Sequence, residues 1–128
     1  MIVVLGFYKR HPDLSWEEFS DHWRNVHGAL LRDTPEPRKA IRRYVQHHLR
    51  PNPGFPGESL PFDGFSESWY DSVESRQELW ALPLWRDLVI PDEQTFLDTA
   101  ATRVSVLDSQ YTVIGDPITI GGEVVSFF

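Results

Sequence analysis

Histidine is the side chain of this protein best suited to moving a proton, because imidazole titrates close to neutral pH. The chain contains five histidines and no cysteine, which excludes thiolate nucleophiles and cysteine-bound metals. His27 is the most informative of them, since it lies between Trp23 and Leu30 in the apolar arc of an expected helix and therefore faces the interior. It is either a core histidine satisfied by one hydrogen bond or the general acid or base of an enzyme.

The histidines do not form an obvious metal site. His22 and His27 are five residues apart, which on an α-helix separates their side chains by about 140°. His47 and His48 are adjacent on an expected strand, so they point to opposite faces. Glycine-rich phosphate loops, a nucleophile elbow and a zinc-protease motif are absent from the sequence. We therefore expect no bound metal and no bound cofactor.

One expected strand carries a row of polar side chains on a single face. Tyr44, Gln46 and His48 alternate with the other residues of the segment 41–49. Rows of this kind usually face solvent on a half-exposed strand. The alternative is that the row faces a binding pocket, where a phenol and an imidazole can hydrogen-bond a ligand.

A second expected strand carries a carboxylate in apolar company. Glu67 lies between Phe65 and Trp69 on one face of the segment 65–70. A carboxylate in such surroundings needs a cationic partner or becomes protonated. An arginine is the expected partner, and Arg43 on the neighbouring strand is a candidate.

The bulk composition fits one soluble globular domain over residues 1–128. The chain is 41% hydrophobic and 24% charged, and its net charge of −7 opposes non-specific binding to nucleic acids or anionic membranes. No apolar run approaches the roughly 20 residues of a membrane span. The apolar amino terminus runs directly into Lys9 and Arg10, unlike a signal peptide, which places its charge first. We expect a cytoplasmic protein with no nucleic-acid or membrane partner.

The order of the expected elements is β-α-β-β-α-β, which predicts a ferredoxin-like α+β fold. Ser15 and Glu18 form a capping box that begins the first helix, and Pro35 ends it. A loop rich in proline and glycine at 51–61 is long enough to be a lid or an arm. The expected strands are 2–9, 41–49, 65–70 and 104–114, and the expected helices are 16–34, 73–80 and 92–99, with breaks around Pro83 and Pro91.

A sheet with helices on one face leaves its other face uncovered. A second copy of the chain is the economical cover, so we expect a homodimer that buries on the order of 1,600 Å² or more. The extension at 115–128 is apolar, unlike a disordered terminus. We expect it to pair as a strand or arm, either within its own subunit or, slightly preferred, with the partner.

Four separated blocks of the sequence resemble EthD-like domains. Between them they span about residues 2–114, and Gly28-Ala29 replaces the small residue and proline that usually follow the family's histidine. The blocks are KRHPDLSWEEF at 9–19 with HWRNVH at 22–27, RRYVQHH at 42–48, DGFSESWYDS at 63–72 and DEQTFLD at 92–98.

The resemblance implies a dimeric α+β barrel with a pocket between the sheet and the helices of each subunit. His27 would be the general acid or base, and Tyr44 and His48 would hydrogen-bond a developing enolate oxygen. Trp23, Trp69 and Tyr70 would form stacking walls. The expected site residues are His27, Tyr44 and His48 for catalysis and Trp23, Asp63, Glu67, Trp69 and Tyr70 for substrate binding.

Fold membership does not choose the reaction, because function resides in the site. The leading hypothesis is a cofactor-independent lyase or isomerase of the dehydratase or cyclase type, acting on a hydrophobic aromatic, polyketide-like or lactone molecule. The second hypothesis is a cofactor-free monooxygenase on a similar aromatic substrate. The third is a non-catalytic accessory subunit that binds a hydrophobic small molecule.

Overall fold

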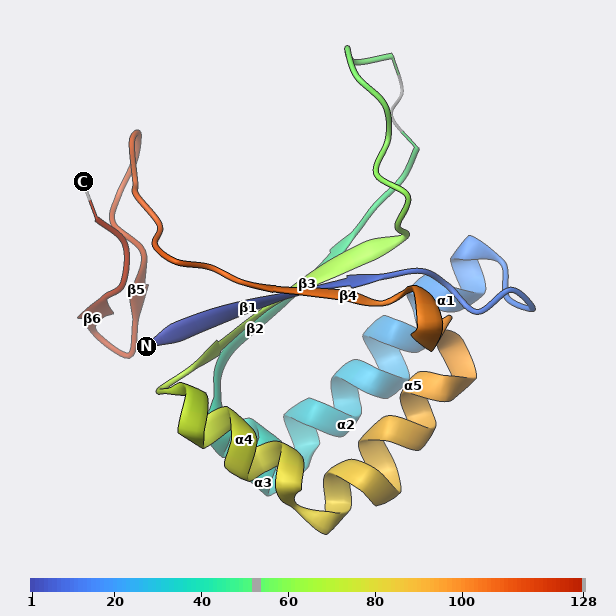
Figure 1. Cartoon of the computed structure of the whole chain (residues 1–128), viewed down its shortest axis with the longest axis horizontal. Helices are drawn as coiled ribbons and strands as arrows, with labels where there is room; N and C mark the ends of the chain where they lie inside the picture. The colour runs from blue at the N-terminus through green and yellow to red at the C-terminus, as the bar shows by residue number, and fades with distance from the viewer. Residues whose placement is uncertain (52–53, 128) are drawn as a thin grey trace.

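A computed structural model of the chain describes residues 1–51 and 54–127, which leaves Asn52, Pro53 and Phe128, in the predicted loop and tail, outside the description. Four antiparallel strands form a sheet in the order β2-β3-β1-β4, with the helices on one side of it (Figure 1). This arrangement confirms the predicted ferredoxin-like α+β fold. The strands are β1 (Ile2–Tyr8), β2 (Ile41–His48), β3 (Gly64–Tyr70) and β4 (Arg103–Val106).

The first helical layer begins at the predicted capping box. The Ser15 hydroxyl accepts from the Glu18 amide, and the Glu18 carboxylate accepts from the Ser15 amide. The predicted end of this helix near Thr34–Pro37 is confirmed, since the helical run ends at Asp33. Pro35 then starts a short new helix, because proline suits the first position, where no amide donor is needed. The elements are α1 (Trp16–His22), the π-helical η1 (Trp23–His27), α2 (Gly28–Asp33) and α3 (Pro35–Ala40).

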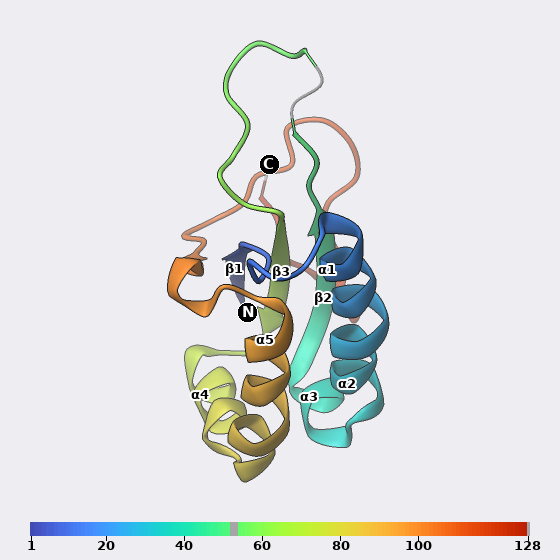
Figure 2. The ribbon, with the colours of Figure 1, turned by 90° about the vertical axis from the view of Figure 1, so that its right-hand side faces the viewer.

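The second helical layer lies beside the first (Figure 2). The predicted break at Pro91 is wrong, since the helix runs through it. The Ile90 amide bonds to the Trp85 carbonyl in a π turn, and Pro91 follows at the first turn of the next helix, where its missing amide costs little. The elements are α4 (Val73–Ala81), π-helical η2 (Trp85–Val89), α5 (Ile90–Phe96) and the 3₁₀ turn η3 (Thr99–Ala101).

The last strand of the sheet is much shorter than the predicted 104–114. β4 ends at Val106, and the chain then leaves the sheet to pair with the tail, where the Phe127 amide bonds to the Gln110 carbonyl. The tail forms its own hairpin of β5 (Thr119–Ile120) and β6 (Glu123–Val124). Gly121 and Gly122 both have positive φ, which a two-residue hairpin turn requires.

Strand alternation sends neighbouring residues into two different cores. Val4 and Tyr70 face the helices and pack with Trp85, whereas Val3 and Trp69 face the other side. There the tail covers them through Ile120 and Val125. The described contacts of the tail are therefore with its own chain. Within residues 1–51 and 54–127, we find no helix with the length and apolar character needed to cross a bilayer.

The packing of the tail predicts its contribution to stability. Replacing buried Ile120 by alanine removes contacts with Val3 and Trp69 and should lower the free energy of unfolding by about 2–4 kcal/mol. Val113→Ala is the control, since Val113 lies just before the tail with 88% of its surface exposed and should change stability by less than about 0.5 kcal/mol. Urea unfolding measures both, and equal effects would show that the tail does not pack on the sheet.

Candidate active site

His27 and Asp92 form a buried pair between the two helical layers. His27 is 6% exposed, and its Nδ1 lies 2.9 Å from one carboxylate oxygen of Asp92. The second oxygen lies 2.8 Å from Nε2 of His22. One carboxylate of α5 therefore holds two imidazoles that belong to the first helical layer.

The π turn brings these two histidines together. The predicted separation of about 140° between His22 and His27 assumed α-helical geometry, and it is wrong for this segment. In η1 the Gly28 amide bonds to the Trp23 carbonyl, five residues back. Because a π turn aligns residues i and i+5, His22 and His27 face the same side and reach the same carboxylate.

The environment of Asp92 sets the tautomer of His27. Burial by itself would raise the pKa of Asp92, but the hydrogen bonds from His27 and His22 outweigh it and lower the pKa below its ordinary value. An ionised carboxylate accepts only, so Nδ1 of His27 carries a proton, and in the neutral ring Nε2 has the lone pair. Within residues 1–51 and 54–127, no hydrogen bond reaches that Nε2.

A small cavity opens between this pair and the sheet. It offers about 80 Å³ of free space and combines apolar walls with a few polar groups. Its polar side chains come from the sheet and from the helices. Ligand sites often have a few polar groups of this kind, which fix the orientation of the ligand. The polar and aromatic residues that line it are Tyr8, His27, Tyr44, Ser66, Ser68, Tyr70, Arg76, Trp80, Trp85, Glu93 and Thr102.

Tyr44 presents an unused donor to this cavity. Its phenol oxygen accepts from Nε1 of Trp23 at 3.1 Å and lies 3.5 Å from Nε2 of Gln46, so the phenol proton remains free to donate. Burial raises the pKa of Tyr44 well above its ordinary value, which keeps that proton in place. Gly28 permits this arrangement, since a Cβ there would come within 3.3 Å of Gln46.

Glu93 is the acid of the cavity. Burial raises the pKa of its carboxyl group, an effect that the nearby His27 opposes and Asp92 reinforces. Its side chain forms no hydrogen bond or ion pair with residues 1–51 and 54–127. Beside it, Tyr8 shares a 3.2 Å hydrogen bond with Ser66, and burial raises the pKa of Tyr8 to about 12.

His48 and Trp23 support the site without lining the cavity. Both nitrogens of His48 are occupied, Nδ1 by the Ser20 hydroxyl at 2.7 Å and Nε2 by Gln46 at 2.9 Å. Trp23 is 1% exposed and holds Tyr44 through its indole donor. The polar row on β2 thus faces the helices rather than solvent.

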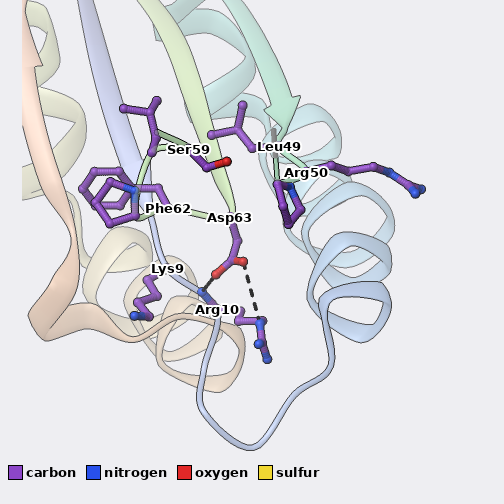
Figure 3. A pocket seen from close by; sticks show the side chains of 10 residues that line it. Lys9, Arg10, Leu49, Arg50, Ser59, Phe62 and Asp63 are labelled. Carbon is purple, nitrogen blue, oxygen red and sulfur yellow. Dashed lines mark hydrogen bonds and ion pairs between the residues drawn. The ribbon is translucent and has the colours of Figure 1, made fainter. Parts of the chain in front are cut away.

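Asp63 belongs to a different cleft, next to the first residue of β3. Its carboxylate accepts from the Arg10 amide at 2.8 Å and pairs with the Arg10 guanidinium at 3.7 Å (Figure 3). This open cleft has about 460 Å³ of free space and lies against the loop that follows β2. Asp63 therefore connects that loop to the segment between β1 and the first helix, away from His27.

Glu67 and Trp69 lie on the opposite face of the sheet from the cavity. Glu67 was expected to pair with an arginine such as Arg43, but its partner is His47, at 2.6 Å. The register allows either partner, because Arg43 and His47 flank Val45, the residue opposite Glu67, on the same face of the neighbouring strand. Trp69 is buried beneath the tail. Of the predicted site residues, His27, Tyr44 and Tyr70 share the cavity.

The residues that the sequence analysis missed include Asp92, the partner of His27, and the charged cavity residues Glu93 and Arg76. Asp92 and Glu93 entered it only as part of the last helix, and Arg76 not at all. The available signal was the pair of adjacent acids following Pro91 in a largely apolar stretch. Across residues 1–51 and 54–127, no three histidine, aspartate or glutamate side chains are arranged to hold a metal ion.

Comparison with known proteins places the fold. A family model described as the EthD domain matches residues 11–100. No curated protein matches the sequence.

Three solved structures illustrate the likeness. An EthD family protein from Bacillus halodurans is 21% identical, with a TM-score of 0.63 over 86% of this chain and 100% of that one. A dimeric protein of unknown function with a ferredoxin-like fold, from Bacteroides fragilis, is 13% identical. Its TM-score is 0.58, over 83% of this chain and 93% of that one. SnoaB, a cofactor-independent oxygenase from Streptomyces nogalater, is 10% identical. Its TM-score is 0.57, over 88% of this chain and 95% of that one. At these identities the likeness concerns the fold alone.

The raised pKa of Glu93 predicts a pH-dependent stability. Unfolded Glu93 ionises near 4.5, whereas the folded carboxyl group keeps its proton to higher pH. The unfolded state therefore binds fewer protons in this window, and wild-type stability falls as the pH rises through it. Glu93→Gln should be more stable than wild type at pH 8, with the difference shrinking towards pH 4.

Urea unfolding between pH 4 and pH 8 measures this difference. Glu78→Gln, at an exposed position of α4, is the control and should show no such trend. A wild-type to Glu93→Gln difference that stays constant with pH would contradict the burial of this carboxyl group.

Proposed function

Since the chain belongs to the EthD domain family, we propose that it is a cofactor-independent enzyme that uses His27 to move a proton on a hydrophobic small molecule. The observation that carries this proposal is the buried His27–Asp92 pair, whose free Nε2 belongs to a side chain at the wall of the cavity. A carboxylate that orients an imidazole and stabilises its charged form is the usual arrangement for a histidine base.

The proposed step begins with proton removal from a carbon next to a carbonyl group. Nε2 of His27 takes the proton, and Asp92 stabilises the imidazolium that forms. The electron pair of the broken C–H bond moves to the carbonyl oxygen, and the phenol of Tyr44 donates a hydrogen bond to that oxygen. No redox partner is needed, because the carbonyl group holds the charge.

The fate of the proton then defines a lyase or an isomerase. The imidazolium returns it either to a leaving hydroxyl group, which departs as water, or to another carbon of the substrate. Glu93 is a second proton donor within the same cavity. Tyr70, Trp80 and Trp85 provide flat aromatic walls, which suit an aromatic or polyketide-like substrate.

A cofactor-free oxygenase is the second candidate. The observation in its favour is the shared fold with SnoaB, which is described as such an oxygenase. The same proton removal would yield a carbanion that reacts with O₂ in place of the elimination step. Oxygen consumption with an anthrone or hydroquinone identifies this reaction, whereas its absence alongside proton exchange identifies the lyase or isomerase.

Replacing His27 tests the proposed base. His27→Ala should lower the rate of hydrogen exchange next to a carbonyl by about 10²–10⁴-fold. Asp92→Asn should also lower it, because the amide no longer fixes the productive tautomer. NMR in D₂O, with a panel of aryl β-hydroxyketones, anthrones and lactones, measures this exchange. His11→Ala, outside the cavity, is the control, and full exchange by folded His27→Ala would end the assignment.

We also propose that the chain forms a homodimer through the outer face of the sheet. Phe7 and Phe65 stack there with 5.6 Å between ring centroids, beyond the part that the tail covers. The similar protein from Bacteroides fragilis is described as dimeric. A second copy would bury these rings, as the uncovered face of a two-layer fold requires.

Light scattering at micromolar concentration tests the dimer. The wild-type protein should have twice the mass of one chain, and Phe65→Asp should shift it towards the monomer because a charge would be buried at the contact. Val26→Asp is the control, since Val26 is 49% exposed on the helical side. A wild-type monomer would contradict the proposal.

A further inference from the structure

Two buried donors of the cavity have no hydrogen-bond partner. Within residues 1–51 and 54–127, only Nε of Arg76 and Nε1 of Trp85 are side-chain nitrogen or oxygen atoms that are both buried and unpaired. Both side chains line the cavity that also holds His27. An unpaired buried donor costs about 1–3 kcal/mol, and native structures contain few of them. Two in one cavity point to a ligand that brings an acceptor.

Aromatic rings hold Arg76 in a fixed orientation. Its guanidinium carbon lies 4.2 Å from the ring centroid of Trp80 and 6.0 Å from that of Tyr70. Trp80 in turn stacks on Trp85, with 4.9 Å between centroids and 28° between ring planes. A guanidinium that stacks through its face keeps its N–H edges for a planar acceptor.

Arg76 also lacks an acidic partner. Arg42 and Arg86 pair with neighbouring aspartates at the surface, but no carboxylate of residues 1–51 and 54–127 lies within 4.0 Å of Arg76. Other basic side chains without an ion pair, such as Arg43 and Arg103, are exposed, whereas Arg76 is partly buried. A partly buried cation without a counter-charge is costly unless a ligand supplies one.

We propose that Arg76 selects a substrate that carries an anionic oxygen, most simply a carboxylate, with the indole N–H of Trp85 as a second donor. The proposal rests on the proposed use of this cavity as the substrate site. A planar carboxylate fits the fork of a guanidinium through two parallel hydrogen bonds. Arg76 thus acts as a specificity-determining residue, whereas His27 acts on the reacting carbon.

The charges around Arg76 are compatible with an anion. Glu93 is the one acid among the residues that line the cavity, and burial favours its neutral form. Asp92 is committed to His22 and His27. Because Arg76 and Trp85 come from α4 and η2, whereas His27 comes from η1, the anion and the reacting carbon would occupy different parts of the substrate.

Paired acids and amides test this inference without any turnover. Salicylate and 2-naphthoate are compared with salicylamide and 2-naphthamide, which have nearly the same shape and no charge. Calorimetric titration at pH 7 should show the wild-type protein binding an acid at least about tenfold more tightly than its amide. Arg76→Met should remove this preference while changing amide affinity less than about threefold.

Two further variants separate charge recognition from damage to the fold. Arg76→Lys keeps the charge and should retain part of the preference. Arg86→Met removes an exposed arginine of η2 that pairs with Asp87, outside the cavity, and should leave the preference intact. The melting temperature of each variant reports on folding.

The outcomes decide the inference independently of the proposed reaction. It is overturned if wild type binds neither acid or shows no preference, or if folded Arg76→Met keeps the preference. If His27→Ala proves fully active while the Arg76-dependent preference stands, the proposed reaction fails and the anion site remains.

Discussion

The widened turn at Trp23–His27 decides which side chains meet in this protein. With α-helical geometry His22 and His27 would diverge, and one carboxylate could not hold both. The π turn directs both imidazoles towards α5, where Asp92 accepts from each. The contact joins the two helical layers and also fixes the tautomer of His27. The second π turn, η2, begins with Trp85 of the same cavity, in keeping with the frequent occurrence of such turns at functional sites.

A chain of hydrogen bonds between the sheet and the first helices holds Tyr44 in place at the cavity. The chain begins at Ser20 of α1 and runs through His48, Gln46 and Tyr44 on the inner face of β2, and Trp23 closes it from the helix side. Gly64 makes room for the indole of Trp23 against the sheet, because a Cβ at this position would lie 2.4 Å from that indole. Apart from the donor of Tyr44, the groups of this network are paired, which favours a fixed position for the Tyr44 ring.

Local sequence patterns predicted the elements that depend on local physics. The alternation of Tyr44, Gln46 and His48 and the capping box at Ser15 follow from neighbouring residues alone, and both were found. The length of β4 could not be predicted this way, because residues 110–112 pair with the distant tail. The partner of Glu67 depended on contacts between strands: Val45 lies directly opposite Glu67, Arg43 and His47 flank Val45 on the same face, and His47 makes the contact. Asp92 was missed because its role requires both a π turn and the contact between helical layers.

Adjacent carboxyl groups on α5 have opposite environments, and this difference gives the site two kinds of acid. Asp92 and Glu93 are consecutive, so their side chains diverge by about 100° around the helix. Asp92 meets two imidazoles that favour its ionised form, whereas Glu93 enters the cavity, where burial favours its neutral form. Divergent pKa values of neighbouring acids are a mark of acid–base sites. One helical turn therefore carries both the carboxylate that orients His27 and a neighbouring carboxyl group that holds its proton to higher pH.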